Sequence, residues 1–304
     1  MLSQDVERYV TLQRTLGFKF GDQSCSLKLF ADYAAAQGDE FIRVERVLAW
    51  AAQTPSAQRR CTLVARVRRF ALAMHAENPR HEVPPRGCVG HAKIARKTPY
   101  IYTADDIDSI MCAARQMPAK GFIAPATLTT LLGLLASTGL RISEALSLEC
   151  SDLGDDGLII RKSKHGKSRL IPLHETTEAA LGRHLNERAR QPVFTESVFV
   201  SSNGQAILYH AIRDAFRRLM VRAGLRPGFS GTGPRMHDLR HTFAVRSLEQ
   251  CRPDRQAVAQ HMIALSTYLG HTNVTDTYWY LEATPIIMRG IAMAGEAMHQ
   301  GGDA

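Results

Sequence analysis

Long apolar runs are absent from this chain. No segment of its 304 residues approaches the roughly 20 apolar residues that a helix needs to span a bilayer. The first ten residues, MLSQDVERYV, carry acidic side chains early and lack the basic start and apolar run of a secretory signal peptide. These absences exclude a helical membrane protein and predict a cytoplasmic protein with no membrane partner.

Cysteine is scarce and scattered. The chain has six cysteines, and no two of them form a Cys-x-x-Cys pair. A disulfide framework or a zinc ribbon needs regularly spaced cysteines, so neither is expected. The pattern indicates reduced, structural thiols at Cys25, Cys61, Cys88, Cys112, Cys150 and Cys251.

Acidic side chains are too few to balance the basic ones, and the net charge is +9. Residues 59–97 hold ten basic side chains and only two acidic ones. Such a block attracts polyanions, above all nucleic acid, but a solvated surface that aids solubility has the same composition. On charge alone both interpretations stay open. The candidate DNA-binding side chains are Arg59, Arg60, Arg66, Arg68, Arg69, Lys93, Arg96 and Lys97.

The length of the chain favours two domains. Residues 1–76 have apolar spacing typical of helices, with glycine and proline breakers between them. The last of these helices, expected over Ala57–His75, interleaves arginines with apolar residues, which predicts a small helical bundle with a basic side. Residues 77–99 contain four prolines and two glycines, and they are interpreted as a basic linker that could follow a phosphate backbone.

The second domain is expected over residues 100–284, followed by a tail at 285–304. Thr103 with the acidic residues after it is typical of a helix start, and a stripe of leucines ends at Gly139. Two short strands, 158–162 and 168–172, flank a hairpin turn. Further helices are expected at 175–189, 207–224, 237–250, 256–269 and 275–282. The fold class is therefore mainly α, with a mixed α/β second domain that carries a small sheet.

Polar clusters lie at the ends of these predicted elements. Arg141, in STGLRISEAL, follows a helix end, where its guanidinium offers a fork of donors suited to phosphate. The segment KSKHGKSR places several cations on the hairpin, and HDLRH places His237 and Arg240 on one helix face. In LGHTNVTDTYWYL, His271 follows a glycine and precedes two tyrosines.

Each cluster by itself is more typical of a surface or a helix cap than of a site. His237 and His241 have the spacing of zinc ligands, but Asp238 stands where the zincin pattern has glutamate. No further His or Cys has a persuasive spacing for a third ligand. We therefore expect neither a metal nor another cofactor.

In combination and order, these clusters resemble the catalytic domain of the tyrosine recombinase (phage integrase) family over about residues 100–283. The matching segments are TGLRISE, KHGKSR followed by LIPL, HDLRHTFA and LGHTNVTDTYWY. The bundle before them resembles the family's core-binding domain, which has a SAM-like fold. LGFKF and DTYWYLEATP are similar to segments of transposon-borne integrases, which favours a simple two-domain, mobile-element type.

The resemblance also implies the catalytic residues. The family lysine stands just before the turn glycine, here Gly166, which selects Lys164 over Lys167. The family spacing after the later histidine selects Tyr280 over Tyr278. Because these tyrosines differ by about 200° around a helix, Tyr278 is expected to pack inward. The implied catalytic set is Arg141, Lys164, His237, Arg240, His271 and Tyr280.

These residue types suit the cleavage of a phosphodiester. Arginines can clamp the non-bridging oxygens, on which negative charge increases during attack. Tyr280 attacks phosphorus to form a covalent phosphotyrosine, and Lys164 can protonate the leaving hydroxyl. The resemblance implies a 3′-phosphotyrosine and a Holliday junction, with four protomers acting on double-stranded DNA that carries a recombination site. It places the protein in the cytoplasm, at the nucleoid.

Several alternatives stay open from the sequence. A type IB topoisomerase shares the catalytic set but relaxes supercoils as a monomer, and a non-catalytic DNA-binding protein could keep the fold. The apolar tail near Ile286 and Ile291 either docks on a neighbouring subunit or packs on its own domain. The DNA target sequence and any accessory recombinases or DNA-bending proteins are not visible in the residues.

Overall fold

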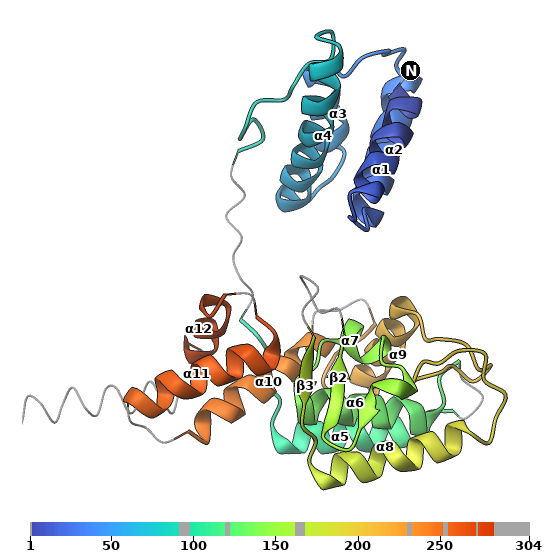
Figure 1. Ribbon diagram of the computed structural model, residues 1–304, viewed down its shortest axis with the longest axis vertical. Helices are drawn as coiled ribbons and strands as arrows, with labels where there is room; N and C mark the ends of the chain where they lie inside the picture. Colours follow the sequence, from blue (N-terminus) through green and yellow to red (C-terminus); the bar gives the residue numbers. More distant parts are fainter. Residues whose placement is uncertain are drawn as a thin grey trace, which may run out of the picture. The chain divides into compact units, whose positions relative to one another are not determined.

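The computed structural model describes residues 2–90, 98–118, 122–161, 168–229, 233–251, 255–271 and 273–282. They form two compact units, divided between Lys97 and Thr98 (Figure 1). Helices dominate both units, and the second also holds a three-stranded sheet, so the predicted fold class is confirmed. In the described ranges, no helix combines the length and apolar character that a bilayer span requires.

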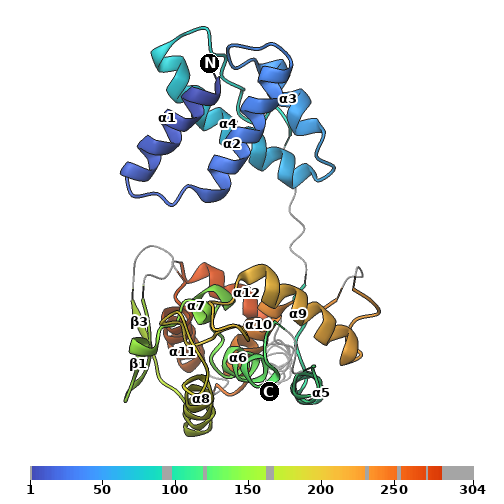
Figure 2. The same cartoon turned by 90° about the vertical axis from the view of Figure 1, so that its right-hand side faces the viewer.

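The first unit is a bundle of four helices around one apolar core (Figure 2). Ser56 begins the last helix, because its hydroxyl accepts a hydrogen bond from the backbone N–H of Arg59 at 3.3 Å. Leu63, Val67 and Phe70 of that helix recur at helical spacing and face the core, together with Leu27 and Phe30. The helices are α1 (Leu2–Thr15), α2 (Gly21–Ala36), α3 (Val44–Ala52) and α4 (Ala57–Glu77).

The segment that follows α4 differs from the expected linker. Residues 78–90 fold back onto the bundle, and Val83 and Val89 pack against its core. The Glu82 carboxylate accepts a hydrogen bond from the backbone N–H of Val44 at 2.7 Å, at the start of α3. The buried ring of His81 accepts one from Ile42. These polar contacts join residues that are far apart in the sequence. The local content of proline and glycine, on which the linker was predicted, could not reveal them.

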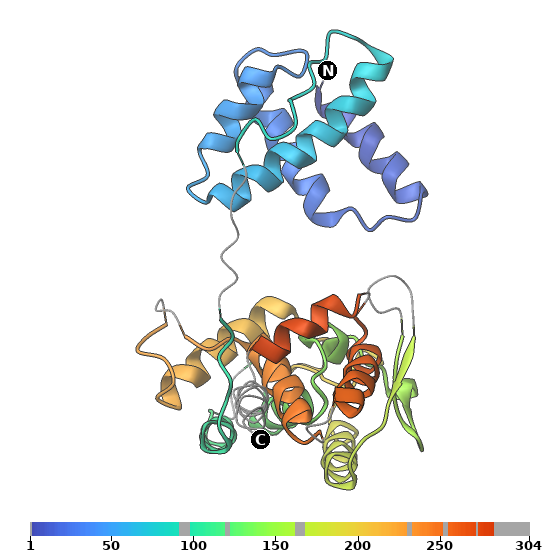
Figure 3. The ribbon, with the colours of Figure 1, turned by 90° about the vertical axis from the view of Figure 1, so that its left-hand side faces the viewer.

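The second unit packs eight α-helices and the small sheet around its cores in the part of the chain that the structure describes. Figure 3 looks onto its C-terminal helices, drawn in orange to red. Thr103 and Asp106 form a complete capping box at the first helix, as the sequence indicated. The helices are α5 (Ala104–Arg115), α6 (Pro125–Thr138), α7 (Ile142–Leu146), α8 (Glu175–Arg188), α9 (Tyr209–Arg222), α10 (Met236–Glu249), α11 (Arg255–Leu269) and α12 (Thr275–Glu282).

Helix α6 is the centre of this unit, and its end determines where the next residues lie. Leu128, Leu131 and Leu135 are almost fully buried, so the predicted leucine stripe is core. Gly139 ends the helix with φ of +62°, a left-handed conformation that favours glycine. A Cβ atom at this position would lie 2.6 Å from the ring of Phe243 in α10. Glycine therefore allows α6 and α10 to approach closely where Arg141 begins α7.

The sheet has the antiparallel order β1 (Leu153–Gly154), β2 (Gly157–Ile160) and β3 (Arg169–Ile171). The two predicted strands are present, each somewhat shorter than expected, and β1 was not anticipated. Figure 2 shows β3 next to α11, which agrees with the contacts between them. The segment that joins β2 to β3 lies outside the described residues, and Lys164 lies in it.

Candidate active site

Two arginines converge on the C-terminal end of α11. Arg240, on α10, is only 2% exposed and donates to the carbonyls of Gly139 at 2.9 Å and Leu269 at 2.7 Å. Arg141, at the start of α7, donates to the carbonyl of Leu269 at 3.3 Å and to that of Gly270 at 3.4 Å. The unpaired carbonyls of a helix end carry partial negative charge, which favours cations there. One helix end thus gathers both guanidiniums.

Burial weakens the hold of Arg240 on its proton, and the neighbouring positive charge of Arg141 adds to this effect. Together they lower the pKa of Arg240 to about 10. The side chain therefore stays cationic at neutral pH, although it is almost completely removed from solvent. A fixed charge of this kind, close to Arg141, is suited to binding an anionic group.

Glu144 and Arg169 belong to the same cluster, and the sequence interpretation assigned neither a role. The Glu144 carboxylate accepts from Arg141 Nη1 at 2.9 Å and from Arg169 at 3.1 and 2.9 Å. Burial alone would raise the pKa of Glu144, but the hydrogen bonds from Arg169 and from the backbone of Arg141 outweigh it and keep the pKa low. The signal for Glu144 was its position three residues after Arg141, the spacing of a capping box.

A row of aromatic rings connects the two histidines of the predicted catalytic set with Tyr280. His237 lies edge-on to His241 at 4.7 Å between ring centroids, and His241 lies 5.5 Å from the Tyr280 ring. His271 stacks with Tyr280 at 6.0 Å between ring centroids, and its Nδ1 is 2.7 Å from the hydroxyl of Thr277. Three elements, α10, the turn after α11, and α12, therefore bring these rings together. His241, which the sequence interpretation considered only as a zinc ligand, lies between His237 and Tyr280 in this row.

One of the two tyrosines of α12 does not lie as the sequence predicted. Tyr278 is 53% exposed, so the expectation that it packs inward is wrong. Tyr280 is 3% exposed and packs against α10 and α11 with Leu265 and Leu269. The two side chains are about 200° apart around the helix, as predicted, but it is Tyr280 and not Tyr278 that faces the core. Tyr280 as a whole is therefore almost fully buried.

The neighbouring histidines have altered proton affinity. His237 is exposed at the edge of the row, yet the partial burial of its ring, and then Arg240 and Arg235, lower its pKa. Burial first, and His237 next, lower the pKa of His241 to about 4. Both rings are therefore neutral near pH 7, so they are able to accept hydrogen bonds.

The pKa of His241 predicts that the second unit loses stability as the pH falls from 6.5 toward 4. In this window the unfolded chain binds a proton that the folded chain excludes, so the free energy of unfolding decreases with decreasing pH. For His241 the full effect is at most about 3 kcal/mol. Urea unfolding of wild type and His241→Gln at several pH values measures it. The exposed His210→Gln is the control, and identical pH slopes for wild type and His241→Gln would contradict the prediction.

The predicted DNA-binding arginines of α4 are not one free surface. Arg60 donates to the carbonyls of Thr54 and Pro55 at 2.9 and 3.0 Å, near the end of α3. Arg66 donates to Asp22 O at 3.1 Å and to Ser26 Oγ at 2.6 Å. The remaining three are Arg59 and Arg69, which are exposed, and Arg68, which is partly buried. Lys93, Arg96 and Lys97 lie outside the described residues.

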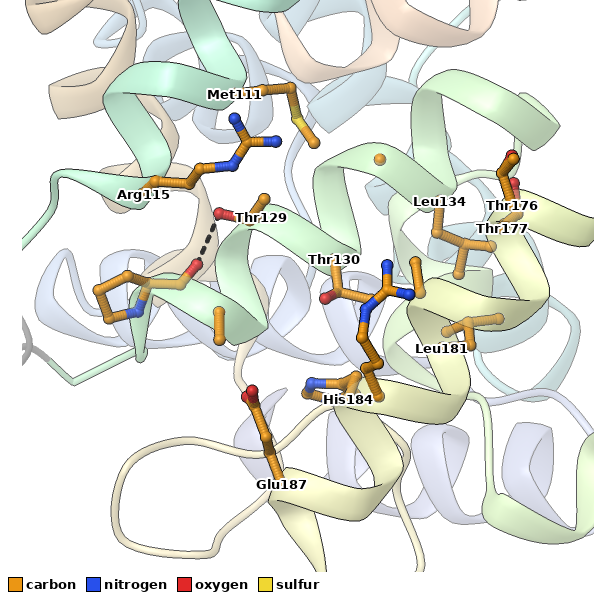
Figure 4. A pocket seen from close by; sticks show the side chains of 15 residues that line it. Met111, Arg115, Thr129, Thr130, Leu134, Thr176, Thr177, Leu181, His184 and Glu187 are labelled. Carbon is orange, nitrogen blue, oxygen red and sulfur yellow. Dashed lines mark hydrogen bonds between the residues drawn. The ribbon is translucent and has the colours of Figure 1, made fainter.

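A groove beside α6 is separate from the arginine cluster at the end of α11. It has a volume of about 520 Å³, lies between α5, α6 and α8, and is lined by residues such as Arg115, Thr130 and His184 (Figure 4). None of the predicted catalytic residues lines it. No group of three or more His, Cys, Asp or Glu that could hold a metal ion occurs among the described residues.

Comparisons with known proteins agree with this arrangement. The sequence profile of the Phage integrase family matches residues 101–285. A Sinorhizobium fredii protein named as an integrase/recombinase, y4rB, is 36% identical over 94% of this chain and 94% of its own length. Tyrosine recombinase XerD of Mycobacterium tuberculosis is 31% identical over 65% of this chain and 61% of its own length.

A solved structure shows the same fold. A lambda integrase tetramer bound to a Holliday junction covers 90% of this chain and 77% of its own chain, with a TM-score of 0.63 and 20% identity. The family profile spans more than half of the chain, and the y4rB relative is more than 30% identical over nearly all of it. The chain therefore belongs to the phage integrase family, as a tyrosine-type site-specific recombinase.

Proposed function

We propose that this recombinase cleaves and rejoins DNA through a covalent 3′-phosphotyrosine at Tyr280. The observation that carries the proposal is the convergence of Arg141 and Arg240 on one helix end, beside the row of rings that contains Tyr280. Cations that are fixed before the substrate binds can stabilise a phosphoryl transition state without costly rearrangement. The neighbouring tyrosine supplies an oxygen nucleophile.

The proposed step balances without a metal or ATP. The Tyr280 oxygen forms a bond to phosphorus, its proton passes to a neighbouring base, and the bond from phosphorus to the 5′-oxygen breaks. His237 and His271 are suited to move or share this proton, since imidazoles act near neutral pH. Lys164, on the connection between β2 and β3, gives a proton to the departing 5′-oxygen. The phosphotyrosine conserves the bond energy, so a second DNA hydroxyl can reverse the reaction.

The buried position of Tyr280 adds a condition to this proposal. Tyr280 is almost fully buried against α10 and α11, and its oxygen has to reach a phosphate, so we infer that α12 shifts when DNA binds. Helix α12 has only eight residues and contacts α10 and α11. Such a shift would therefore move a short helix and leave the rest of the unit in place. Formation of the active site would then be coupled to DNA binding.

We further propose that four copies act on two DNA sites through a Holliday junction. Support comes from the fold shared with lambda integrase, which was solved as a tetramer on such a junction. A mobile-element integrase is the favoured biological type, because LGFKF and DTYWYLEATP are similar to segments of transposon-borne integrases. The first unit is proposed to act as the core-binding domain, together with the basic segment that follows it.

Covalent trapping tests the chemistry. Wild-type protein, a chelator and nicked duplexes derived from DNA that flanks the gene are expected to give a protein–DNA adduct that survives denaturant. A protein that binds this DNA but yields no adduct would overturn the proposed cleavage. A two-site plasmid separates recombination from relaxation, because a topoisomerase changes supercoiling without exchanging the flanking segments.

The exposed arginines of α4 are expected to contact phosphates. Arg59→Gln with Arg69→Gln should flatten the plot of log binding constant against log salt by about 1.8, since each lost phosphate contact contributes roughly 0.9. Filter binding at several salt concentrations measures this slope. The control pair is Arg8→Gln with Arg43→Gln, because both arginines already pair with carboxylates. An unchanged slope in the first double variant would show that this face does not touch DNA.

A further inference from the structure

Arg169 is a largely buried arginine that donates to three acceptor atoms on two other elements. It opens strand β3, opposite Ile160 of β2, and only 10% of its side chain is exposed. Its Nη1 and Nη2 bind the two oxygens of Glu144 at 3.1 and 2.9 Å, and its Nε donates to the carbonyl of Tyr268 at 2.8 Å. All three guanidinium nitrogens are therefore engaged.

The same guanidinium packs on the turn that precedes His271. A Cβ atom at Gly270 would lie 2.7 Å from Arg169 Nη1 and 3.0 Å from Cζ. Gly270 also has φ of +66°, so a side chain there would be strained as well as crowded. Arg169 thus lies where strand β3, the start of α7 and the end of α11 come together.

The negative charge of Glu144 explains why Arg169 is useful beside Arg141 and Arg240. Without Arg169, Glu144 would keep Arg141 as its one guanidinium partner among the described residues and would neutralise it more fully. With Arg169 bound to both carboxylate oxygens, the positive charge of Arg141 is less compensated. Lysine is a poor substitute, because one ammonium does not reproduce the planar fork and the additional Nε–H bond.

We propose that Arg169 is a positioning residue for DNA cleavage, which fixes the hairpin strand to Glu144 and to the end of α11. It acts through these groups and does not touch the phosphate. Lys164 precedes β3 by a few residues in the sequence, so we expect a displaced β3 to impair the protonation step proposed for Lys164. The inference rests on the proposed function of Lys164 as the group that protonates the leaving oxygen.

The test measures single-turnover cleavage of two nicked substrates from DNA that flanks the gene. One has the normal 5′-oxygen at the cleaved phosphate and the other a bridging sulfur, whose thiolate leaves without being protonated. The variants are Arg169→Gln, Arg169→Lys and Lys164→Ala. The matched control is Arg161→Gln, since Arg161 lies just after β2 and pairs with Asp152. Circular dichroism melting checks that each variant folds.

Arg169→Gln is expected to slow cleavage of the oxygen substrate by about 10²-fold, as a misplacement near 1 Å would. The sulfur substrate should restore most of the rate, as in Lys164→Ala, and Arg169→Lys should fall between wild type and Arg169→Gln. Arg161→Gln should behave as wild type on both substrates. Wild-type cleavage by Arg169→Gln overturns the proposal. So does slow cleavage of both substrates by Arg169→Gln while sulfur rescues Lys164→Ala, because Arg169 would then only support the fold.

Failure of sulfur to rescue Lys164→Ala would instead overturn the role of Lys164 in the proposed function. Hydrogen exchange of the backbone amides then decides the case of Arg169 without catalysis. Arg169→Gln should accelerate exchange at Gly270 and His271, and Arg161→Gln should not. Equal exchange at these two amides in all three proteins would overturn the positioning role.

Discussion

Replacing Tyr280 with phenylalanine is expected to abolish covalent capture of DNA, while DNA binding survives. The substitution removes the one oxygen that can form the phosphotyrosine, so no slower route through the same residue remains. The ring stays, and its contacts with His241 and His271 should keep α12 in place. Denaturing gels of the trapped adduct and native gels of the complex measure the two properties separately.

Tyr278→Phe is the matched control, because it removes the same atom two residues away on the same helix. Its ring is 53% exposed and lies outside the row of histidines. We expect it to form the adduct at the wild-type rate. Adduct formation by Tyr280→Phe together with its loss in Tyr278→Phe would transfer the nucleophile assignment to Tyr278.

Substitution of Arg240 is expected to have the second-largest effect. Arg240→Met and Arg240→Lys should each slow single-turnover cleavage by about 10²- to 10³-fold, the usual loss when one fixed donor to a developing charge is removed. Methionine supplies no donor at all. Lysine keeps the charge, but its ammonium does not reproduce the two-carbonyl geometry by which Arg240 joins Gly139 to Leu269.

Stability should change in parallel, because buried carbonyls lose their donors. The carbonyl of Gly139 loses a guanidinium, at a cost of about 1–3 kcal/mol, and removal of a buried charge offsets part of this. Arg246→Met is the matched control, since Arg246 is on the same helix and donates to the carbonyl of Tyr102 away from the cluster. Equal cleavage rates for Arg240→Met and Arg246→Met would remove Arg240 from the proposed machinery.

Much of the fold was predictable because its cues are local. A capping box at Thr103, an N-cap at Ser56 and a left-handed glycine at position 139 each act within a few residues, so the sequence reveals them directly. The leucine stripe of α6 is equally local, because helical periodicity alone shows which face is buried. These cues predicted most of the helices and two of the three strands.

The remaining features depend on contacts between distant residues. Val83 and Val89 pack on the first bundle, although proline and glycine near them are typical of a linker. Arg66 donates to Asp22 and Ser26 on another helix. The count of basic residues in the sequence could not show these contacts, so Arg66 was interpreted as a free cation. Tyr278 was placed wrongly because a helix of eight residues has too few apolar positions to show which side faces the core.

The candidate site was predictable in its list of residues but not in how they are held. The motif order indicated Arg141, His237, Arg240, His271 and Tyr280, and the structure brings these five together in one region. The acceptors that hold the arginines are backbone carbonyls of Gly139, Leu269 and Gly270, which no side-chain pattern can show. The site residues themselves stay a proposal until the variants are measured.

The order in which the chain is synthesised has a consequence for the end of α11. Of the predicted catalytic residues, Arg141 is synthesised first and Tyr280 last, and at 5–20 residues per second the interval lasts roughly 7–28 s. During this time the carbonyls of Leu269 and Gly270, which hold Arg141 in the folded protein, have yet to be made. Chains shortened before residue 269 therefore lose the arrangement of the arginines as well as the tyrosine. Incomplete translation products would be harmless to DNA rather than half-active.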